Sequence, residues 1–317
     1  MSIFSHILVG TDGSEAADEA VDFAARLAHE HDGELILCHA VNWLPPVASA
    51  VDAGAMIDPA PILAELRAAG EAYIDRAARR AKAAGVAPQH RVVEGAAAPS
   101  ILDLARDEGC TLIVMATHGR AGLELFFVGS TTEAVLRGST IPVLTIRAGK
   151  HTARPGRCFE RIIVGIDDSE PSDAALATVV DFPAEDRRHV LLCGVAGSAF
   201  VVGGHDYRQA AIDELHEETE RVVETALAAA GERGRSFEVR VVDGRTAPAL
   251  LAAAEQEQAD LMVLGSHGRR GLRRLFLGSV AENVVQSASI PVLVVRGPQN
   301  KNGNFTDSSR RLATISA

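Results

Sequence analysis

The sequence predicts an α/β protein made of two tandem, doubly wound domains, each with a five-stranded parallel sheet. Short β-branched runs alternate with longer, Ala-rich segments of helical period along the chain, and the same order of segments occurs twice. Strands that alternate with helices form right-handed crossover units, which give parallel sheets covered by helices. We expect the strand order 3-2-1-4-5 in each domain.

The repeat is visible in short blocks that keep their order. The matching pairs are His6–Asp12 with Arg161–Asp167, Val92–Gly95 with Val241–Gly244, Ala116–Arg120 with Gly265–Arg269, Gly129-Ser130 with Gly278-Ser279, and Ile141–Leu144 with Ile290–Leu293. The first pair is 155 residues apart and the later pairs are 149 apart, which indicates a net loss of residues after the second strand. Ordered blocks of this kind indicate a duplication.

The periodicity assigns five strands and four helices to each half. In the first half, strands are expected at His6–Gly10, Glu34–Ala40, Gln89–Val93, Leu112–Ala116 and Val143–Ile146, and helices at Glu15–Glu30, Ile62–Ala84, Pro99–Asp107 and Thr131–Arg137. In the second half, strands are expected at Ile162–Ile166, Val190–Cys193, Glu238–Val242, Leu261–Gly265 and Val292–Val295, and helices at Ser172–Val180, Arg208–Ala229, Ala249–Gln256 and Val280–Gln286. The strands are continuous apolar runs, which is typical of a parallel sheet buried on both faces.

These elements place one domain at residues 1–150 and the other at residues 160–297. Residues 151–159 are a short polar linker. Residues 298–317 lack periodicity and are rich in Asn, Ser and Thr, so we expect a disordered tail.

The composition limits the possible functions. The net charge of −11 argues against nucleic-acid binding, because a phosphate backbone attracts basic surfaces. No apolar run approaches the roughly 18–20 residues of a membrane-spanning helix, and the N-terminus lacks the basic flank of a signal peptide. The four cysteines form no CxxC motif or Cys/His cluster. We therefore expect a cytoplasmic protein with reduced thiols, no protein metal site, no nucleic-acid partner and no membrane insertion.

The most informative motif follows a predicted strand in the second half. Gly265-x-x-Gly268 is separated by nine residues from Gly278-Ser279, where a helix is expected to begin. Glycine lets the backbone approach a ligand, and successive N–H groups can form an anion-binding concavity. A helix N-terminus also favours phosphate. The spacing therefore indicates a phosphate site.

The serines have a purely structural explanation as well. Ser130-Thr-Thr-Glu133 and Ser279-Val-Ala-Glu282 match a capping box, in which the Ser and Glu side chains bond to N–H groups at the helix start. A cap does not explain the paired glycines or the fixed gap between them.

The glycine spacing, an early strand ending in Val-Gly-x-Asp and a closing Ile-Pro-Val strand together resemble the universal stress protein family. The resemblance covers about residues 5–147 and 160–297. It implies the adenine nucleotide alpha hydrolase-like fold and, in the ATP-binding branch of the family, phosphates held by the glycine motif. The expected cofactor is therefore ATP, with Mg²⁺ as an optional companion ion.

The resemblance also implies that Asp12 and Asp167 face the nucleotide, and that residues near Val41 and Val195 line the adenine pocket. Sheet geometry leads to the same edge, because ligands of doubly wound sheets bind beyond the carboxyl ends of the strands where the winding reverses. An Asp after a strand is more simply a turn residue when taken alone. Its convergence with the glycine motif favours ligand contact.

Other polar groups lie within the motif loop. His118 and His267 are equivalent, and with no nucleophile or orienting acid beside them we expect them to shape the loop or touch the nucleotide. Basic side chains could offset phosphate charge: Arg120, Arg269, Arg270, Arg273 and Arg274. The expected nucleotide-binding residues are Asp167, Val195, Gly265, His267, Gly268, Arg269, Gly278 and Ser279 in the second half, and Asp12, Val41, Gly119, Gly129 and Ser130 in the first.

The first half departs from the motif, because Ala116 replaces the first glycine. A methyl group there restricts the backbone and could crowd a phosphate. We therefore expect the second half to hold the stronger nucleotide site.

The sequence favours a regulatory module in the stress response over an enzyme. It has no Gly-x4-Gly-Lys-Ser/Thr phosphate loop, no evident set of metal carboxylates and no placed base, so we assign no catalytic residue. The alternatives are a weak ATPase or phosphotransferase, a nucleotide-free scaffold and a flavin-binding relative. A regulatory module requires a protein partner, which the sequence does not identify.

The two closing strands lead to a prediction about assembly. Ile141–Ile146 and Ile290–Val295 are apolar strands expected at a sheet edge, where an unpaired strand promotes aggregation. Pairing them would give an intramolecular pseudo-dimer, and a homodimer is the further possibility.

Overall fold

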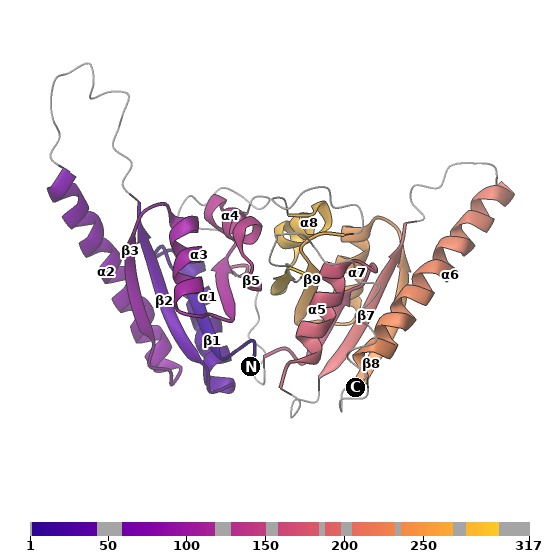
Figure 1. Ribbon diagram of the computed structural model, residues 1–317, viewed down its shortest axis with the longest axis horizontal. Helices are drawn as coiled ribbons and strands as arrows, with labels where there is room; N and C mark the ends of the chain where they lie inside the picture. Colours follow the sequence, from indigo (N-terminus) through magenta and orange to yellow (C-terminus); the bar gives the residue numbers. More distant parts are fainter. Residues whose placement is uncertain are drawn as a thin grey trace, which may run out of the picture. The chain divides into compact units, whose positions relative to one another are not determined.

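The computed structural model describes residues 2–42, 59–117, 128–149, 158–183, 188–197, 205–231, 236–268 and 277–297. The chain divides into two compact units, of which one spans Phe4–Gly138 and the other begins at Ser139 (Figure 1). The predicted tail and most of the predicted linker lie outside the described residues.

The first unit is a parallel sheet with helices on both faces. Its elements in chain order are β1 (His6–Gly10), α1 (Glu15–Glu30), β2 (Glu34–Val41), α2 (Pro59–Ala83), β3 (Gln89–Glu94), α3 (Ala97–Asp107), β4 (Leu112–Ala116) and α4 (Ser130–Gly138). The strand order is β3-β2-β1-β4, with each described pair parallel. Helices α1 and α2 contact each other, as do α3 and α4, which gives one helical layer for each face.

The second unit repeats this plan. Its elements are β5 (Val143–Ile146), β6 (Arg161–Gly165), α5 (Glu170–Val180), β7 (His189–Ala196), α6 (His205–Ala230), β8 (Ser236–Asp243), α7 (Thr246–Gln256), β9 (Leu261–Gly265), α8 (Ser279–Ser287) and β10 (Val292–Val295). The order β8-β7-β6-β9-β10 is the predicted 3-2-1-4-5 arrangement.

Strand β5 comes from the first sequence repeat but lies in the second unit, where it pairs antiparallel with β10. Leu144 stands opposite Leu293, and the Thr145 hydroxyl donates to the carbonyl of Val292 at 3.2 Å. The expected pairing of the two closing strands is therefore present. It covers a row of backbone groups that a free sheet edge would expose.

Side-chain caps explain why the first helix of each half begins where it does. Ser14 accepts a hydrogen bond from the Ala17 N–H at 3.1 Å, and Ser169 accepts from the Ser172 N–H at 3.3 Å. Each cap satisfies one of the N–H groups that the first helical turn leaves without a partner. Small buried residues then form the face of α1 that packs on the sheet.

The predicted capping boxes of the last helices are wrong. The N-cap of α8 is Gly278, and no side chain caps this end. The N–H of Glu282 bonds to the carbonyl of Gly278 at 2.9 Å, and in the first half the N–H of Glu133 bonds to the carbonyl of Gly129 at 2.9 Å. Each helix therefore begins one residue earlier than the box requires, so Ser130 and Ser279 lie inside the first turn.

The core consists of the strand interiors and the helix faces against them. All four cysteines are buried and no disulfide joins them, as the sequence predicted. Burial raises the pKa of the Cys38 and Cys193 thiols to about 12. No helix among the described residues is long and apolar enough to cross a membrane.

Candidate nucleotide site

The candidate site of the second half lies where β6 and β9 end side by side. The two strands are parallel neighbours, with Val164 opposite Val263. The chain leaves β6 through Ile166 and Asp167, and it leaves β9 through the first part of the glycine motif. Parallel pairing therefore brings the acid and the glycines to the same edge of the sheet.

Asp167 is held in place by the turn that starts α5. Its Oδ1 accepts hydrogen bonds from the Ser169 N–H at 3.2 Å and from the Ser169 hydroxyl at 2.5 Å. Ser169 is buried, and its hydroxyl also lies 3.3 Å from the carbonyl oxygen of His267. The cap of α5 thus ties the acid to the glycine loop.

The other carboxylate oxygen of Asp167 faces Gly268. A Cβ added at Gly268 would lie only 2.6 Å from Asp167 Oδ2, so a side chain there would force the Asp167 carboxylate to move. Glycine at position 268 therefore leaves the carboxylate in its place, where two segments 101 residues apart in the sequence approach closely. The expected convergence of Asp167 with the glycine motif is present in the structure.

The second part of the motif closes on the first. The N–H of Gly278 donates to the carbonyl of Ser266 at 2.8 Å, and a Cβ at Gly278 would lie 3.2 Å from the Cα of His267. Ser279 is exposed in the first turn of α8. The first N–H groups of an α-helix have no partner within the helix, so the start of α8 offers donors to an anion.

Gly265 has a different role from the one the sequence suggested. A Cβ there would lie 2.6 Å from the carbonyl carbon of Pro171 and 2.8 Å from the nitrogen of Ser172. The missing side chain faces the first turn of α5 and not the glycine loop. Gly265 is therefore explained by the packing of this helix on β9.

This direction changes the interpretation of Ala116. By the repeat, its methyl group takes the direction of the missing Cβ of Gly265, toward α1, and α1 contacts β4. Ala116 is buried. This direction argues against the expected crowding of a phosphate by the Ala116 methyl group.

The halves differ instead in how the second helix covers the turn after the first strand. In the first half, a Cβ at Gly13 would lie 2.3 Å from the Tyr73 ring of α2, and Arg76 donates to the Gly13 carbonyl. His39 Nδ1 lies 2.8 Å from the carbonyl oxygen of Thr11. Three side chains thus pack around the turn that holds Asp12.

Asp12 is held by the same kind of local contact as Asp167. Its Oδ1 accepts from the Ser14 N–H at 2.9 Å, as an Asx turn does. On the fourth strand's side, the N–H of Gly129 donates to the carbonyl of Thr117 at 2.7 Å. The loop that contains His118 and Gly119, and in the second half Arg269 and its neighbouring arginines, lies outside the described residues.

The predicted adenine side lies at the end of the second strands. The Gly95 N–H bonds to the carbonyl of Val41, and the Gly244 N–H bonds to the carbonyl of Ala196. The structural counterpart of Val41 is therefore Ala196, which sequence reasoning missed, whereas Val195 points to the opposite face of the strand. Both Val41 and Ala196 are buried.

His267 is also engaged within its own loop. Its Nδ1 lies 2.9 Å from the hydroxyl of the buried Ser266. Across the described ranges, no group of three or more His, Cys, Asp or Glu side chains could hold a metal ion. Mg²⁺ beside a nucleotide usually binds phosphate oxygens, water and one or two carboxylates.

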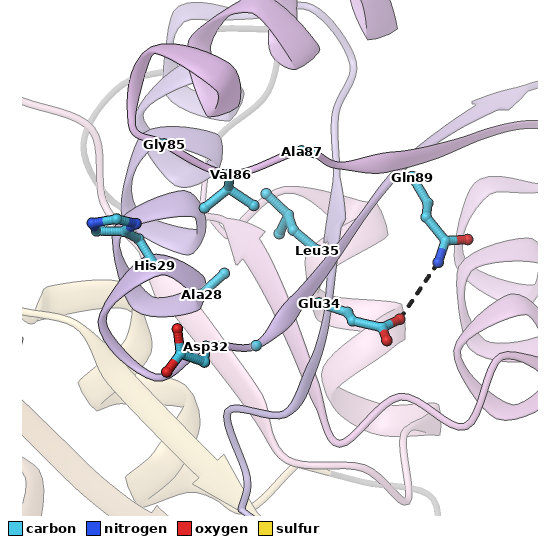
Figure 2. A pocket seen from close by; sticks show the side chains of 10 residues that line it. Ala28, His29, Asp32, Glu34, Leu35, Gly85, Val86, Ala87 and Gln89 are labelled. Carbon is cyan, nitrogen blue, oxygen red and sulfur yellow. Dashed lines mark hydrogen bonds between the residues drawn. The ribbon is translucent and has the colours of Figure 1, made fainter.

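A separate cavity in the first unit lies at the opposite end of the strands. It has a volume of about 340 Å³ and is lined by residues such as Asp32, Glu34, Val86 and Gln89 (Figure 2). Glu34 and Gln89 begin β2 and β3, and the Gln89 amide donates to Glu34 at 3.4 Å. Because doubly wound sheets bind ligands at the carboxyl ends of their strands, this cavity does not belong to the candidate site.

Comparison with known proteins places the chain in a family. The model of the universal stress protein family matches residues 4–147 and again residues 159–296. A universal stress protein of Mycolicibacterium smegmatis is 31% identical over 92% of this chain and 96% of its own length. One from Mycobacterium tuberculosis is 30% identical over 92% of this chain and 96% of its own.

Solved structures support the same fold. A universal stress protein from Archaeoglobus fulgidus has a TM-score of 0.67 at 22% identity, and the match covers 93% of this chain and 97% of that one. The matches cover both halves of the duplication. The chain therefore belongs to the universal stress protein family and carries two copies of its domain in tandem.

Proposed function

We propose that this protein binds an adenine nucleotide, with ATP the preferred ligand, at the carboxyl edge of the second repeat. Bound nucleotide then regulates the interaction with a protein partner in the stress response. The observation that carries the proposal is the close approach of Asp167 to Gly268 beside the start of α8. A carboxylate and a helix N-terminus therefore lie at the same edge of the sheet.

Each group has a chemical role suited to a nucleotide. The Asp167 carboxylate accepts hydrogen bonds, so it suits the hydroxyl groups of a ribose. The N–H groups at Ser279 and the residues after it suit the phosphates. The buried end of β7, at Ala196, supplies an apolar wall for the adenine ring.

Hydrogen bonds fix the polar side chains of the proposed site. Asp167 Oδ1 already accepts two hydrogen bonds from Ser169, and His267 Nδ1 contacts Ser266. Side chains held in this way have a fixed direction, which suits contact with a bound ligand. A regulatory role also requires that the nucleotide favours one of two states, because a ligand with equal affinity for both shifts nothing.

We propose that the second repeat is the stronger of the two sites. The reason is the packing of Tyr73 and Arg76 over the turn of the first repeat. Replacing either Asp167 or its counterpart Asp12 by Asn shows which site contributes the measured binding. Asn keeps the shape of the side chain and removes its charge.

The first experiment is to purify the full chain, denature it and quantify the released nucleotides per chain. Calorimetric titration of the nucleotide-free protein with ATP, ADP, AMP and cyclic AMP follows. We expect Asp167→Asn to weaken the tighter site by about 10- to 100-fold, the range for a lost hydrogen bond to a charged group. Asp12→Asn should leave that site unchanged. No released nucleotide together with no binding on titration would favour the scaffold interpretation.

A further inference from the structure

Helices α5 and α6 of the second unit enclose a cavity of about 260 Å³. Its walls are mostly apolar and include Leu176, Val180, Val222 and Ala226. Three of its lining residues are acidic, namely Asp168, Asp173 and Asp181, and none is basic. The cavity runs between the two helices and is separate from the contacts between Asp167 and the glycine motif.

The first repeat shows what fills the equivalent space, once the two helix pairs are aligned. Helix α2 buries Ile74, Ala77 and Ala81 against the sheet, and α6 buries Val223, Ala226 and Ala230 with the same spacing. These triplets are 149 residues apart, which is also the offset of the strands that follow them. In this register Arg76 corresponds to Thr225 and Arg80 to Ala229.

Contacts with the second strands support the same register. His39 of β2 packs on Gly70, where a Cβ would lie 2.5 Å from its ring. In the second repeat, Gly194 on β7 takes the place of His39, and Thr219 on α6 takes the place of Gly70. The small residue is now on the strand, and a Cβ at Gly194 would lie 2.5 Å from the Thr219 methyl group. The large and small residues have exchanged sides between the repeats, so the helix positions are equivalent.

In the first repeat the space is occupied by guanidinium groups. Arg76 contacts the Asp18 carboxylate at 3.2 Å, and Arg80 forms an ion pair with Asp22 and lies 3.9 Å from Asp18. Asp18 is largely buried. The acid on the first helix is therefore neutralised by cations from the second helix.

The second repeat keeps the acid and lacks both cations. Asp173 corresponds to Asp18, but it faces Thr225 and Ala229 in place of two arginines. Its charged neighbours on α5 and the preceding turn are Asp167, Asp168 and Glu170, and together with burial they raise its pKa to about 6. No basic residue of α6 lines the cavity. The Asp173 carboxylate therefore lies beside an apolar cavity and without a counter-charge in the described part of the chain.

We propose that this cavity binds a small organic cation, an ammonium or guanidinium group on an apolar body. The charged group pairs with Asp173, as the Arg76 guanidinium pairs with Asp18. The apolar body lies along Leu176, Val180, Val222 and Ala226, in the space that larger side chains occupy in the first repeat. Asp168 connects the cavity to the turn that carries Asp167, so a bound cation is next to the proposed nucleotide site without sharing its ligands.

The test measures binding of 2-phenylethylamine and n-propylguanidine to the full chain at pH 7.5, with 2-phenylethanol as the neutral analogue. Calorimetry gives affinity and stoichiometry, and saturation-transfer NMR detects weak complexes. We expect both cations to bind at one site per chain, and the neutral alcohol to bind at least 10-fold more weakly. Binding of the alcohol as tightly as the amine, or no binding of either cation, would overturn the proposal.

Two variants locate the site. Asp173→Asn removes the charge, and Thr225→Arg restores the arginine of the first repeat and fills the cavity, so each should reduce cation binding at least 10-fold. Thr225 is exposed on α6, and circular dichroism and nucleotide titration check that both variants are folded. Asp18→Asn is the matched control and should leave cation affinity unchanged. Retention of full binding by either second-repeat variant would refute the assignment.

Discussion

Asp167 Oδ2 lies 2.6 Å from the point where a side chain on Gly268 would begin. The acid follows β6, the glycine follows β9, and the absence of a side chain on the glycine leaves room for the carboxylate. This contact connects the start of the second repeat with its glycine motif.

Gly268→Ala should weaken nucleotide binding at the second site by 10-fold or more. The new methyl group must displace the Asp167 carboxylate from its bonds with Ser169, so the acid leaves the position proposed for ribose contact. Titration of the nucleotide-free protein measures the effect. The control is Gly149→Ala, which meets open space and carries the extra strain of a positive φ; unchanged affinity in both variants would contradict the proposed site.

Gly265→Ala should destabilise the protein without a comparable loss of nucleotide affinity. The methyl group would meet the backbone of Pro171 and Ser172, and forced contacts of this kind cost about 1–3 kcal/mol. Urea unfolding measures the loss. The reciprocal change, Ala116→Gly, should not strengthen the first nucleotide site. A gain in affinity there would restore the interpretation that the Ala116 methyl group crowds a phosphate.

The stability of the second unit should depend on pH through Asp173. Its pKa is about 6 in the folded state against an ordinary value of 3.8, because it is buried beside Asp168, Asp167 and Glu170. The folded state therefore holds this proton more tightly than the unfolded chain. Its contribution to stability is full below about pH 3.8 and is lost as the pH rises through about 6.

Asp173→Asn should remove that dependence and stabilise the protein at pH 7 by about 1 kcal/mol, after allowance for solvent screening. Thermal unfolding of both proteins between pH 4.5 and 7.5 measures the difference. Asp18→Asn should act in the opposite direction at pH 7, because it removes the partner of Arg76. Equal pH profiles for wild type and Asp173→Asn would contradict the assignment.

The β5–β10 pair should control self-association of the second half. A fragment that begins at Ser139 keeps β5, whereas a fragment that begins at Cys158 exposes the edge of β10. We expect the shorter fragment to self-associate more strongly than the longer one, because removal of β5 leaves the apolar strand β10 without its partner. Light scattering after size-exclusion chromatography distinguishes them, and two well-behaved monomers would show that the pair is dispensable.

The sequence alone determined the fold class, the duplication and the strand order of the second repeat. Hydrophobic periodicity and repeated blocks depend only on the order of residues, so they can be recognised without coordinates. It also predicted that Asp167 would meet the glycine motif, because parallel strands bring their carboxyl ends to one edge. The pairing of the two Ile-Pro-Val strands followed from their apolar character.

Only the tertiary structure decided what each glycine does. Gly265 and Gly268 are three residues apart in one motif, yet the first faces α5 and the second faces Asp167. The direction of a missing side chain depends on which element packs against it, and this is not encoded locally. For the same reason the sequence placed helix caps on Ser130 and Ser279, where the structure begins the helix at the preceding glycine.

The cavity beside Asp173 is the clearest case of information that the fold supplies. Asp173 and Thr225 are ordinary polar residues on two different helices, and neither belongs to a motif. Folding brings them together, and the first repeat shows a cation in the equivalent place. The sequence has Thr225 where the first repeat has Arg76, but only packing reveals that this difference leaves an acid without its counter-charge.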